Sequence, residues 1–221
     1  MTNAALSLPE YYSRRAPEYE RMWYRDDPLR QEEQSAIIAA MSEAFPKRHV
    51  LEVACGTAYW TQFVAPMVEN ILALDASEEM LALAREKKLD PGRVQFVRGD
   101  AYALETLPGS FNAALANFWF SHVPRARHGE FLDGLHEKLE RGASVFMADN
   151  VYVRGVGGEL VDRAGFEDTF KLRTLADGST HEVLKNYFGS GQLETIFAPR
   201  SCNLKIHIGQ CFWWLSYTTP E

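Results

Sequence analysis

Between residues 48 and 150 the sequence alternates apolar, β-forming runs with helical segments, and this alternation limits the chain to few folds. Five runs are typical of strands: 49–55 (HVLEVAC), 70–76 (NILALDA), 94–101 (VQFVRGDA), 111–120 (FNAALANFWF) and 143–150 (ASVFMADN). Runs that are apolar along most of their length are typical of strands covered on both faces. With helices between them, they predict a parallel sheet between two helical layers, which is a three-layer α/β sandwich.

The segments between the runs carry helix signals. Ser77 is an N-cap residue ahead of residues 78–88 (EEMLALAREKK), which place glutamates in the first turn and lysines in the last. Residues 61–68 (TQFVAPMV) predict another helix. Residues 125–142 gather their leucines and a phenylalanine on one face, and we expect Gly142 to end that helix.

The flanking parts differ from this core, and we expect a single domain, 1–221, with three parts: 1–47, 48–150 and 151–221. The first part is polar, aromatic and helical in pattern, with Pro17 dividing or starting a helix. The last part predicts a loop at 154–165, a hairpin around Asp177-Gly178, a short helix and a final aromatic strand. The hairpin suggests that the sheet finishes antiparallel.

Composition excludes several classes of protein. Hydrophobic residues make up 46% and charged residues 24%, which is average for a globular fold. The net charge of -7 lacks the broad positive field that nucleic-acid binding uses, so we expect no nucleic-acid partner. No apolar run approaches the roughly 20 residues of a membrane span, and the first ten residues lack the positive region of a secretory signal.

The three cysteines are scattered without a C-x-x-C pair, which argues against a disulfide framework and a structural zinc site. We therefore expect no metal, no membrane partner, and a reduced, cytoplasmic, soluble protein.

Small residues and acids mark one edge of the predicted sheet. The first strand runs into Ala54-Cys55-Gly56-Thr57-Ala58, whose small side chains allow a sharp turn and close approach to a ligand. Carboxylates stand at or near the ends of the first three strands, at Glu52, Asp75 and Asp100. In an open parallel sheet ligands bind outside the carboxyl ends of the strands, so we expect the three acids to converge on one crevice.

The acids indicate what this crevice binds. They repel a pyrophosphate, and the G-x-G-x-x-G fingerprint of dinucleotide sites is incomplete. They suit a cation that carries hydroxyls, such as S-adenosylmethionine (SAM), with Asp75 placed to accept both ribose hydroxyls. Asp100, Ala101 and Tyr102 are placed at the adenine edge, and Met80 could cover its face. Each acid alone is more often a helix cap or a solvated residue, but the ordered set is far more specific.

The motifs VLEVACGTA, LALDASEEML, VRGDAYALE, ANFWFSHVP and LERGASVFMAD resemble those of class I SAM-dependent methyltransferases of the small-molecule type. This is the broad group that includes the ubiquinone and menaquinone methyltransferases. The resemblance implies a Rossmann-like, seven-stranded, mostly parallel sheet of order 3-2-1-4-5-7-6 with an antiparallel last strand. It also implies that the glycine loop holds the methionine part of SAM, Asp75 the ribose and Asp100 the adenine. Ala54 and Ala58 stand where the family often has glycine.

The complete set of expected cofactor-binding residues comprises Glu52, Ala54, Gly56, Thr57, Asp75, Ala76, Met80, Asp100, Ala101, Tyr102, Asn117 and Phe118.

The methyl acceptor should lie beyond the fourth and fifth strands. His122 follows the fourth and is the leading general base, because its ordinary pKa lies near physiological pH; it could instead cap the loop. Asp149 could bind an amine, orient His122 or cap a turn. Aromatic residues near the start could cover the site as a lid or simply pack between helices. The expected acceptor-binding residues are Tyr11, Tyr12, Tyr19, Trp23, Trp119, His122 and Asp149.

Arg14 and Arg15 could bind a carboxylate, although paired arginines on a helix are usually solvated.

The leading hypothesis is transfer of a methyl group from SAM to an O or N nucleophile of a small metabolite by in-line displacement, with S-adenosyl-L-homocysteine as the product. A methyltransferase that acts on RNA or protein is an alternative. The excess of acidic over basic residues disfavours RNA as the substrate. A nucleotide-dependent oxidoreductase is disfavoured by Glu52 and the incomplete fingerprint. A non-catalytic SAM-binding or partner protein stays open. The sequence names neither the acceptor nor the oligomeric state.

Overall fold

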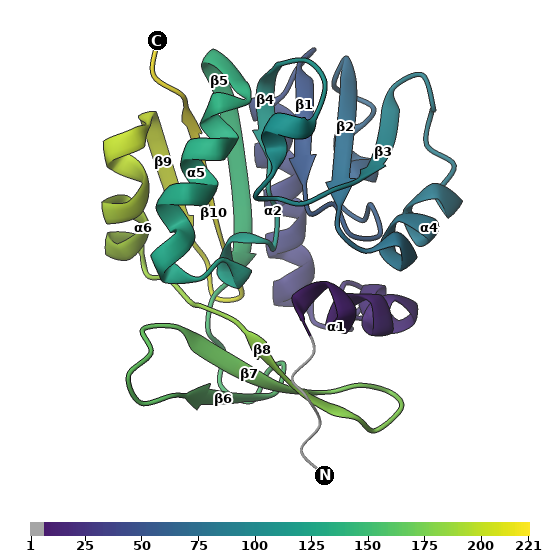
Figure 1. Ribbon diagram of the computed structural model, residues 1–221, viewed down its shortest axis with the longest axis vertical. Coiled ribbons are helices and arrows are strands. Elements are labelled where there is room, and N and C mark those ends of the chain that lie inside the picture. The colour runs from purple at the N-terminus through teal and green to yellow at the C-terminus, as the bar shows by residue number, and fades with distance from the viewer. Residues whose placement is uncertain (1–6) are drawn as a thin grey trace.

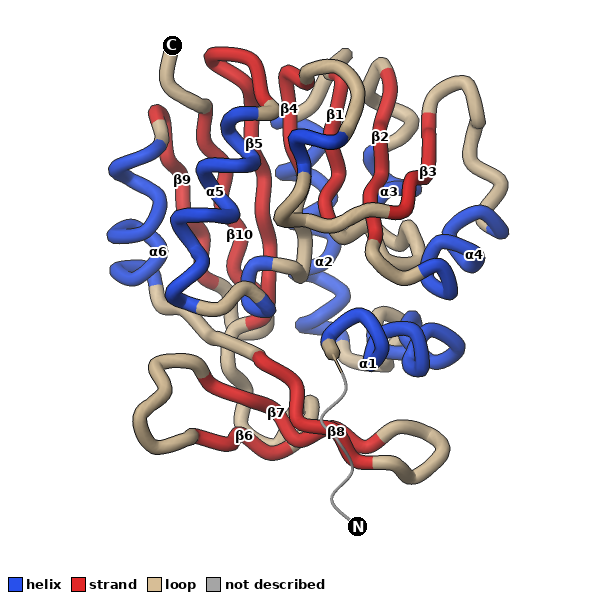
Figure 2. Tube along the Cα trace, in the orientation of Figure 1, coloured by secondary structure: helices blue, strands red, loops and turns tan. Residues whose placement is uncertain are grey.

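The structure, a computed structural model, describes residues 7–221 and is built around a seven-stranded sheet (Figures 1 and 2). The strand order is β3-β2-β1-β4-β5-β10-β9; neighbours from β3 to β5 pair in parallel, and β10 is antiparallel to β5 and β9. These strands are β1 His49–Val53, β2 Asn70–Asp75, β3 Val94–Arg98, β4 Phe111–Leu115, β5 Leu139–Asn150, β9 Cys202–Ile208 and β10 Phe212–Thr218. Counted along the chain, β9 and β10 are the sixth and seventh strands of this sheet, so the predicted order 3-2-1-4-5-7-6 is confirmed. The predicted fold class and antiparallel last strand are confirmed as well.

Helices cover both faces of this sheet, as the layers in Figure 1 show. The helices are α1 Leu8–Arg15, α2 Pro28–Ala44, α3 Thr61–Val64, α4 Glu78–Glu86, α5 His128–Glu137 and α6 Ser190–Phe197. Side chains of α2 and α3 share one apolar cluster with the sheet, and those of α5 and α6 share another. The three-layer sandwich follows from this double coverage.

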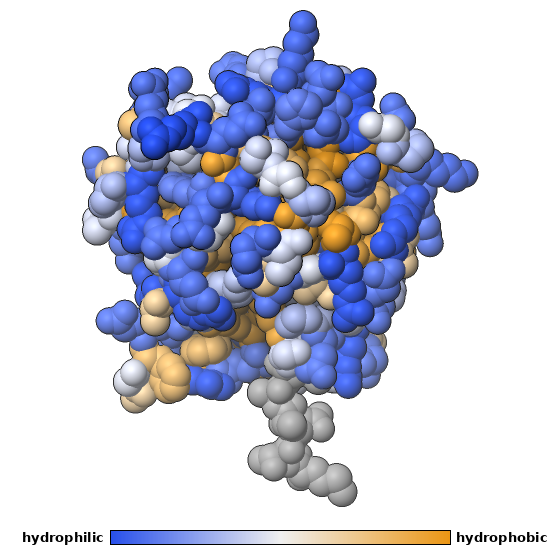
Figure 3. Space-filling model, turned by 45° about the horizontal axis from the view of Figure 1, so that its top comes forward, coloured by the Kyte–Doolittle hydropathy of each residue, from blue (hydrophilic) through white to orange (hydrophobic). Residues whose placement is uncertain are grey.

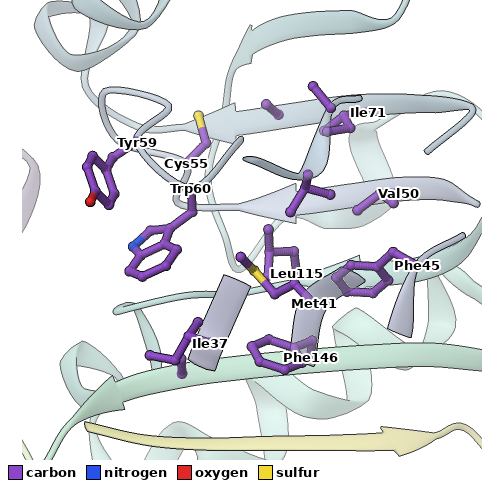
Figure 4. Packing of buried hydrophobic residues seen from close by; sticks show 14 of the residues in the cluster. Ile37, Met41, Phe45, Val50, Cys55, Tyr59, Trp60, Ile71, Leu115 and Phe146 are labelled. Atoms are coloured by element: carbon purple, nitrogen blue, oxygen red, sulfur yellow. The ribbon is translucent and has the colours of Figure 1, made fainter. Parts of the chain in front are cut away.

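The alternation of side chains along a strand explains the two clusters. On β1, Val50 belongs to the α2 cluster and Leu51 to the α5 cluster; on β5, Phe146 and Met147 alternate in the same way. Figure 4 shows Val50, Leu115 and Phe146 packed around side chains of α2. A strand that is buried on both faces needs apolar residues at consecutive positions, which is the pattern visible in the sequence.

The expected start of α4 is confirmed. The Ser77 hydroxyl accepts the Met80 N–H at 3.2 Å, which caps the helix, and Glu78 and Glu79 lie in its first turn. The predicted helix at 61–68 forms only over Thr61–Val64.

The expectation that Gly142 ends a helix is wrong. The helix α5 ends at Glu137, and Gly142 lies within β5 with φ of +70°. Phe111 pairs with Leu139 but Ala113 pairs with Ser144, so β5 holds extra residues over this stretch. Gly142 adopts the left-handed conformation within this irregular stretch, and glycine does so without strain.

The last part of the chain holds a second sheet that the pattern did not separate from the first. Its strands, in the order β6-β7-β8, are β6 Glu159–Asp162, β7 Thr169–Thr174 and β8 Thr180–Leu184. The hairpin around Asp177-Gly178 is confirmed as β7 and β8, but it belongs to this second sheet. The loop predicted at 154–165 is wrong in part because it contains β6. The pattern also gave no sign of β9, an edge strand whose side chains are mostly exposed.

The N-terminal helices lie beside the end of the main sheet toward which its parallel strands point, and the second sheet lies below them (Figure 1). Pro17 follows α1 in the first turn of a 3-10 helix, Ala16–Met22, as its place in the sequence predicts. Ser13 and Ser77 hydroxyls lie 2.9 Å apart, and Glu20 accepts hydrogen bonds from Thr57 at 2.6 Å and Lys87 at 2.7 Å. The N-terminal segment is therefore fastened to the loops after β1 and β2.

Hydrophilic side chains cover most of the face in Figure 3, with apolar residues gathered toward its middle. Over residues 7–221, no helix combines the length and the apolar character needed to cross a membrane. The same residues contain no cluster of His, Cys, Asp and Glu side chains that could hold a metal ion.

Candidate functional site

A cavity of about 800 Å³ opens at the carboxyl ends of the parallel strands. This volume lies within the range of roughly 300–1,000 Å³ that small-molecule sites occupy. The structure brings these predicted site residues together around it: Tyr11, Tyr12, Tyr19, Ala54, Gly56, Asp75, Ala76, Met80, Asp100, Ala101, Tyr102, Phe118, Trp119 and His122. Residues from the N-terminal helices, four strand ends and β8 therefore share one cavity.

Asp75 stands at the end of β2 with its carboxylate fixed in place. One oxygen accepts the Gly56 N–H at 2.8 Å and the other accepts the Ser77 N–H at 2.9 Å. Burial raises the pKa of Asp75, while these backbone donors act in the opposite direction. Each carboxylate oxygen can accept a second hydrogen bond, so the oriented group still has capacity for a ligand hydroxyl.

The glycine loop has a left-handed residue at every second position. Ala54, Gly56 and Ala58 have φ of 55°, 57° and 60°. Left-handed backbone costs a residue with a Cβ roughly 1–2 kcal/mol, so the two alanines hold strain that glycine would avoid. Phe118, which also lines the cavity, has φ of 59°. Strain of this kind concentrates at ligand-binding sites.

The end of β3 forms a second wall. A Cβ at Gly99 would lie 2.4 Å from a methyl carbon of Leu74, so a larger residue would displace this wall. Asp100 is exposed and accepts the Tyr102 N–H at 2.9 Å. The Tyr102 ring is covered by the Arg127 guanidinium, 3.5 Å from its centroid. The wall therefore presents one carboxylate and one supported aromatic ring.

Glu52 does not line the cavity. Its side chain points from β1 toward Thr61, at the start of α3, and is 2% exposed. Burial raises the pKa of Glu52 to about 8, with the charge of Asp75 acting in the same direction, so this carboxyl is protonated at neutral pH. The expected convergence of three acids is therefore limited to Asp75 and Asp100, because alternation along β1 turns Glu52 behind the glycine loop.

Four other predicted residues also lie outside the cavity lining: Thr57, Asn117 and Trp23, which are described here, and Asp149, which is described below. Thr57 donates its hydroxyl to Glu20, and the Asn117 side chain donates to the sulfur of Met41 at 3.3 Å. Trp23 is buried against Phe118, with ring centroids 4.6 Å apart. Each of these side chains supports a residue or segment of the site from behind.

His122 is held by hydrogen bonds on both ring nitrogens. Its Nδ1 lies 2.7 Å from the carbonyl oxygen of Leu184, which can only accept, so Nδ1 carries the proton. Its Nε2 therefore accepts from the Tyr12 hydroxyl at 2.8 Å. Burial and the charge of Lys185 lower the pKa of His122 to about 3, so the ring is neutral across the physiological range. The expectation that this histidine has a pKa near physiological pH is therefore wrong, because the side chain is buried.

Asp149 lies behind His122 and forms a buried ion pair with Lys185. The two groups are 2.7 Å apart, and their side chains are 0% and 3% exposed. Ser121 donates its backbone N–H to Asp149 at 3.0 Å. Burial alone would raise the pKa of Asp149. The Lys185 ammonium outweighs this effect and holds the pKa of Asp149 below its usual range. Among the roles considered for Asp149, the geometry favours ordering the loop that ends in His122.

The site includes two residues that the sequence pattern did not single out, Lys185 and Arg173, beside Arg15, which it named as a possible carboxylate ligand. Lys185 follows β8, in a stretch of the sequence that reads as an apolar strand, and a lysine there is the one signal that could have marked it. Arg15 and Arg173 reach a second, narrower pocket next to the cavity. Arg15 is only half-buried but does not face bulk solvent as paired helix arginines usually do; three tyrosine rings lie within 6.0 Å of its guanidinium.

Comparisons with known proteins agree with this arrangement. Residues 50–142 match the family described as a methyltransferase domain. The demethylmenaquinone methyltransferase of Staphylococcus epidermidis is 33% identical over 98 residues, which are 43% of this chain and 40% of that protein. The chain thus spans less than half the length of this curated relative.

Two solved structures share the fold over nearly the whole chain. A complex of DhpI with SAM and HEP has a TM-score of 0.76 at 23% identity, covering 96% of this chain and 99% of that chain. The N-methyltransferase NodS from Bradyrhizobium japonicum WM9, in complex with S-adenosyl-L-homocysteine, has a TM-score of 0.67 at 11% identity, covering 96% and 98%. Residues 50–142 therefore match a methyltransferase domain, and they include the glycine loop and the strand ends that line the cavity.

Proposed function

We propose that this chain transfers a methyl group from SAM to an O or N nucleophile of a small metabolite. The observation that carries the proposal is the junction of the two pockets. The cavity at the strand ends and the narrower pocket share Tyr12, Tyr19, Phe118 and His122. One pocket can therefore hold a cofactor while the other presents an acceptor to it.

The lining of the larger cavity suits SAM. Asp75 offers an oriented carboxylate for ribose hydroxyls, and Met80 and Tyr102 offer apolar surface for a planar base. SAM, when bound, supplies a methyl group on a sulfonium sulfur. The rings of Tyr12, Tyr19 and Phe118 line the junction, and aromatic ring faces attract cations such as a sulfonium.

The N-terminal helices act as a lid in this proposal. Tyr11, Tyr12 and Tyr19 line the cavity, and the contacts of Ser13 and Glu20 with the loops hold them there. A lid that excludes water strengthens the electrostatic interactions within the site and prevents hydrolysis. Residues 48–150 then supply the cofactor side, and residues 151–221 supply the far wall of the acceptor pocket.

His122 and Tyr12 position the nucleophile in this proposal. The neutral Nε2 of His122 accepts a hydrogen bond, which can come from an acceptor hydroxyl instead of Tyr12. An alcohol becomes strongly acidic as its oxygen bonds to carbon, so even a weakly basic imidazole can take its proton late in the reaction. Because general-base catalysis is most effective when the pKa lies near the working pH, we place the gain at the low end, about 10²-fold.

The variant His122→Gln tests this role. Glutamine can accept a hydrogen bond from Tyr12 but cannot take a proton at neutral pH, so turnover should fall about 10²-fold while SAM affinity stays unchanged. Turnover of the parent enzyme should not follow a histidine titration between pH 5 and 8, because His122 is already neutral there. Measurement of kcat at saturating acceptor decides; a loss under fivefold would leave His122 as a packing residue.

A thermal-shift assay tests the function at the level of the cofactor. SAM at 100 times its Kd should stabilise the fold by about 2.7 kcal/mol, and S-adenosyl-L-homocysteine should act similarly, whereas NAD and NADP should not. Stabilisation by a nicotinamide cofactor alone would contradict the proposal. Binding of SAM without transfer of labelled methyl to any member of a metabolite panel would favour the non-catalytic alternative.

A further inference from the structure

The narrower pocket is positively charged, although the protein carries a net charge of -7. Five cationic side chains line it: Arg15, Arg25, Arg30, Arg173 and Lys185. They come from the end of α1, the loop before α2, the start of α2, β7 and the residue after β8, so chain segments far apart in sequence bring like charges together. No carboxylate side chain is among the described residues that line this pocket.

Most of this charge has no internal counterion. Lys185 is paired with Asp149, but none of the four arginines has a carboxylate within 4.0 Å among residues 7–221. The guanidinium of Arg15 lies over tyrosine rings and donates to the sulfur of Met22 at 3.5 Å. Partly buried like charges repel one another in a medium of reduced dielectric. An arrangement of this kind is stabilised when an anion enters.

The loop after β5 lies close to one of these arginines. A Cβ at Gly157 would lie 2.6 Å from an Nη atom of Arg173, and Gly157 itself has φ of +73°. The guanidinium of Arg173 therefore lies close to the backbone of this loop, and a side chain at position 157 would push it aside. Lys171, on the same face of β7, is held by the carbonyl oxygen of Gly158 at 2.9 Å. The guanidinium of Arg173 thus lies beside the loop backbone.

The space in the pocket is small. Its free volume of about 50 Å³ is room for roughly four water-sized groups, given about one such group per 10–15 Å³. A carboxylate or a phosphoryl head is of this size, whereas a large ring is not. The pocket meets the cofactor cavity at Tyr12, Tyr19, Phe118 and His122, so a molecule anchored there extends toward the point of methyl transfer.

We propose that the methyl acceptor is a small acid whose carboxylate or phosphoryl group is held by Arg15 and Arg173. This inference rests on the proposed function and narrows its substrate class. Planar guanidinium groups bind both kinds of anion through paired N–H donors. The same charge disfavours an acceptor whose only ionised group is an ammonium, so an amine acceptor must also carry an acidic group.

Calorimetric titration of the full chain saturated with S-adenosyl-L-homocysteine tests the proposal without requiring turnover. The probes are propionic acid, ethylphosphonic acid and propionamide, at constant ionic strength because exposed charges are screened by salt. At least one acid should bind, and the neutral amide should not. The preferred acid distinguishes a planar carboxylate site from a tetrahedral phosphoryl site. Equal binding of the amide, or binding of none of the three, overturns the proposal.

Arg15→Met and Arg173→Met locate the anion. Each should weaken binding of the preferred acid at least tenfold, since hydrogen bonds to charged groups contribute about 1.5–3 kcal/mol. The matched control is Arg14→Met, which removes the same charge at an exposed neighbouring position and should change acid affinity less than twofold. Unchanged acid affinity in both pocket variants refutes the assignment.

SAM affinity, measured in parallel, separates this proposal from the proposed function. Arg15→Met and Arg173→Met should bind SAM as the parent does. If they lose SAM affinity instead of acid affinity, the arginines hold the carboxylate of the cofactor and the acceptor proposal fails while the function stands. If the parent protein binds neither SAM nor its product, the proposed function itself fails.

Discussion

Lys185→Met should destabilise the fold by about 3–5 kcal/mol, because it leaves Asp149 as a buried carboxylate without its cation. Both side chains are excluded from water, and the ion pair joins the segment after β8 to the end of β5. Denaturant unfolding at pH 7 measures the loss. A decrease below 1 kcal/mol would show that water or a rearranged donor replaces the ammonium, which this geometry does not predict.

The pH dependence identifies the cause. Lys185 holds the pKa of Asp149 below its usual range, so the parent loses stability as the pH falls through that depressed pKa. In Lys185→Met the pKa of Asp149 should rise instead, because only burial then acts on it. The variant should gain stability as Asp149 takes up a proton. The difference in the free energy of unfolding between parent and variant should therefore become smaller as the pH falls.

Two further variants serve as controls. Lys171→Met removes another buried lysine, whose ammonium is held by carbonyl oxygens and has no carboxylate within 4.0 Å in the described chain. Lys171→Met should lower the free energy of unfolding by less than Lys185→Met does. Its difference from the parent should not become smaller as the pH falls. The double variant Lys185→Met with Asp149→Asn should recover most of the lost stability, because no unpaired charge remains.

The sequence predicted the fold well because the information is local. Buried parallel strands such as β1, β4 and β5 need consecutive apolar residues, and the Ser77 cap needs only its own hydroxyl and the next turn. The predictions were wrong where a tertiary contact determines the local structure. Gly142 is typical of a helix end, but the register between β4 and β5 places it in a strand. The sheet to which the hairpin of β7 and β8 belongs depends on pairing with β6, which no local signal marks.

The site divides in the same way. Asp75 and Asp100 could be predicted because parallel strand ends meet at one edge whatever the side chains around them. The charge of the narrower pocket could be anticipated only at Arg15, because Arg173 lies on the second sheet, whose contact with the N-terminal helices has no local signal in the sequence. For Glu52 the sequence predicts the position, close to the glycine loop. It does not predict the face of the sheet to which the side chain points.

Asp75→Ala should weaken SAM binding at least tenfold and up to about 100-fold. A carboxylate that accepts charge-assisted hydrogen bonds from ligand hydroxyls contributes about 1.5–3 kcal/mol. Asp75 also orients Gly56 and Ser77 through their N–H groups, so its loss releases the loop as well as the contact. Calorimetric titration with SAM and with S-adenosyl-L-homocysteine measures the change, and circular dichroism checks that the variant is folded.

Asp90→Ala is a matched control. Asp90 accepts the Gly92 N–H two residues on, at 2.9 Å, just as Asp75 accepts that of Ser77, but it lies outside the cavity. Its loss should leave SAM affinity unchanged. If Asp75→Ala remains folded and binds SAM as tightly as the parent, the ribose assignment is wrong.

Protonation provides an independent test of the same carboxylate. Burial raises the pKa of Asp75, and hydroxyl donors from the ribose should favour its ionised form and lower that pKa again. SAM affinity of the parent should therefore fall as the pH decreases through the raised pKa of the free protein, and binding in that range should release a proton. Asp75→Asn keeps the shape of the side chain but cannot titrate, so its weaker affinity should be flat over the same pH range. A flat profile in the parent would mean that another group holds the ribose, because a carboxylate in contact with the ligand must link its protonation to binding.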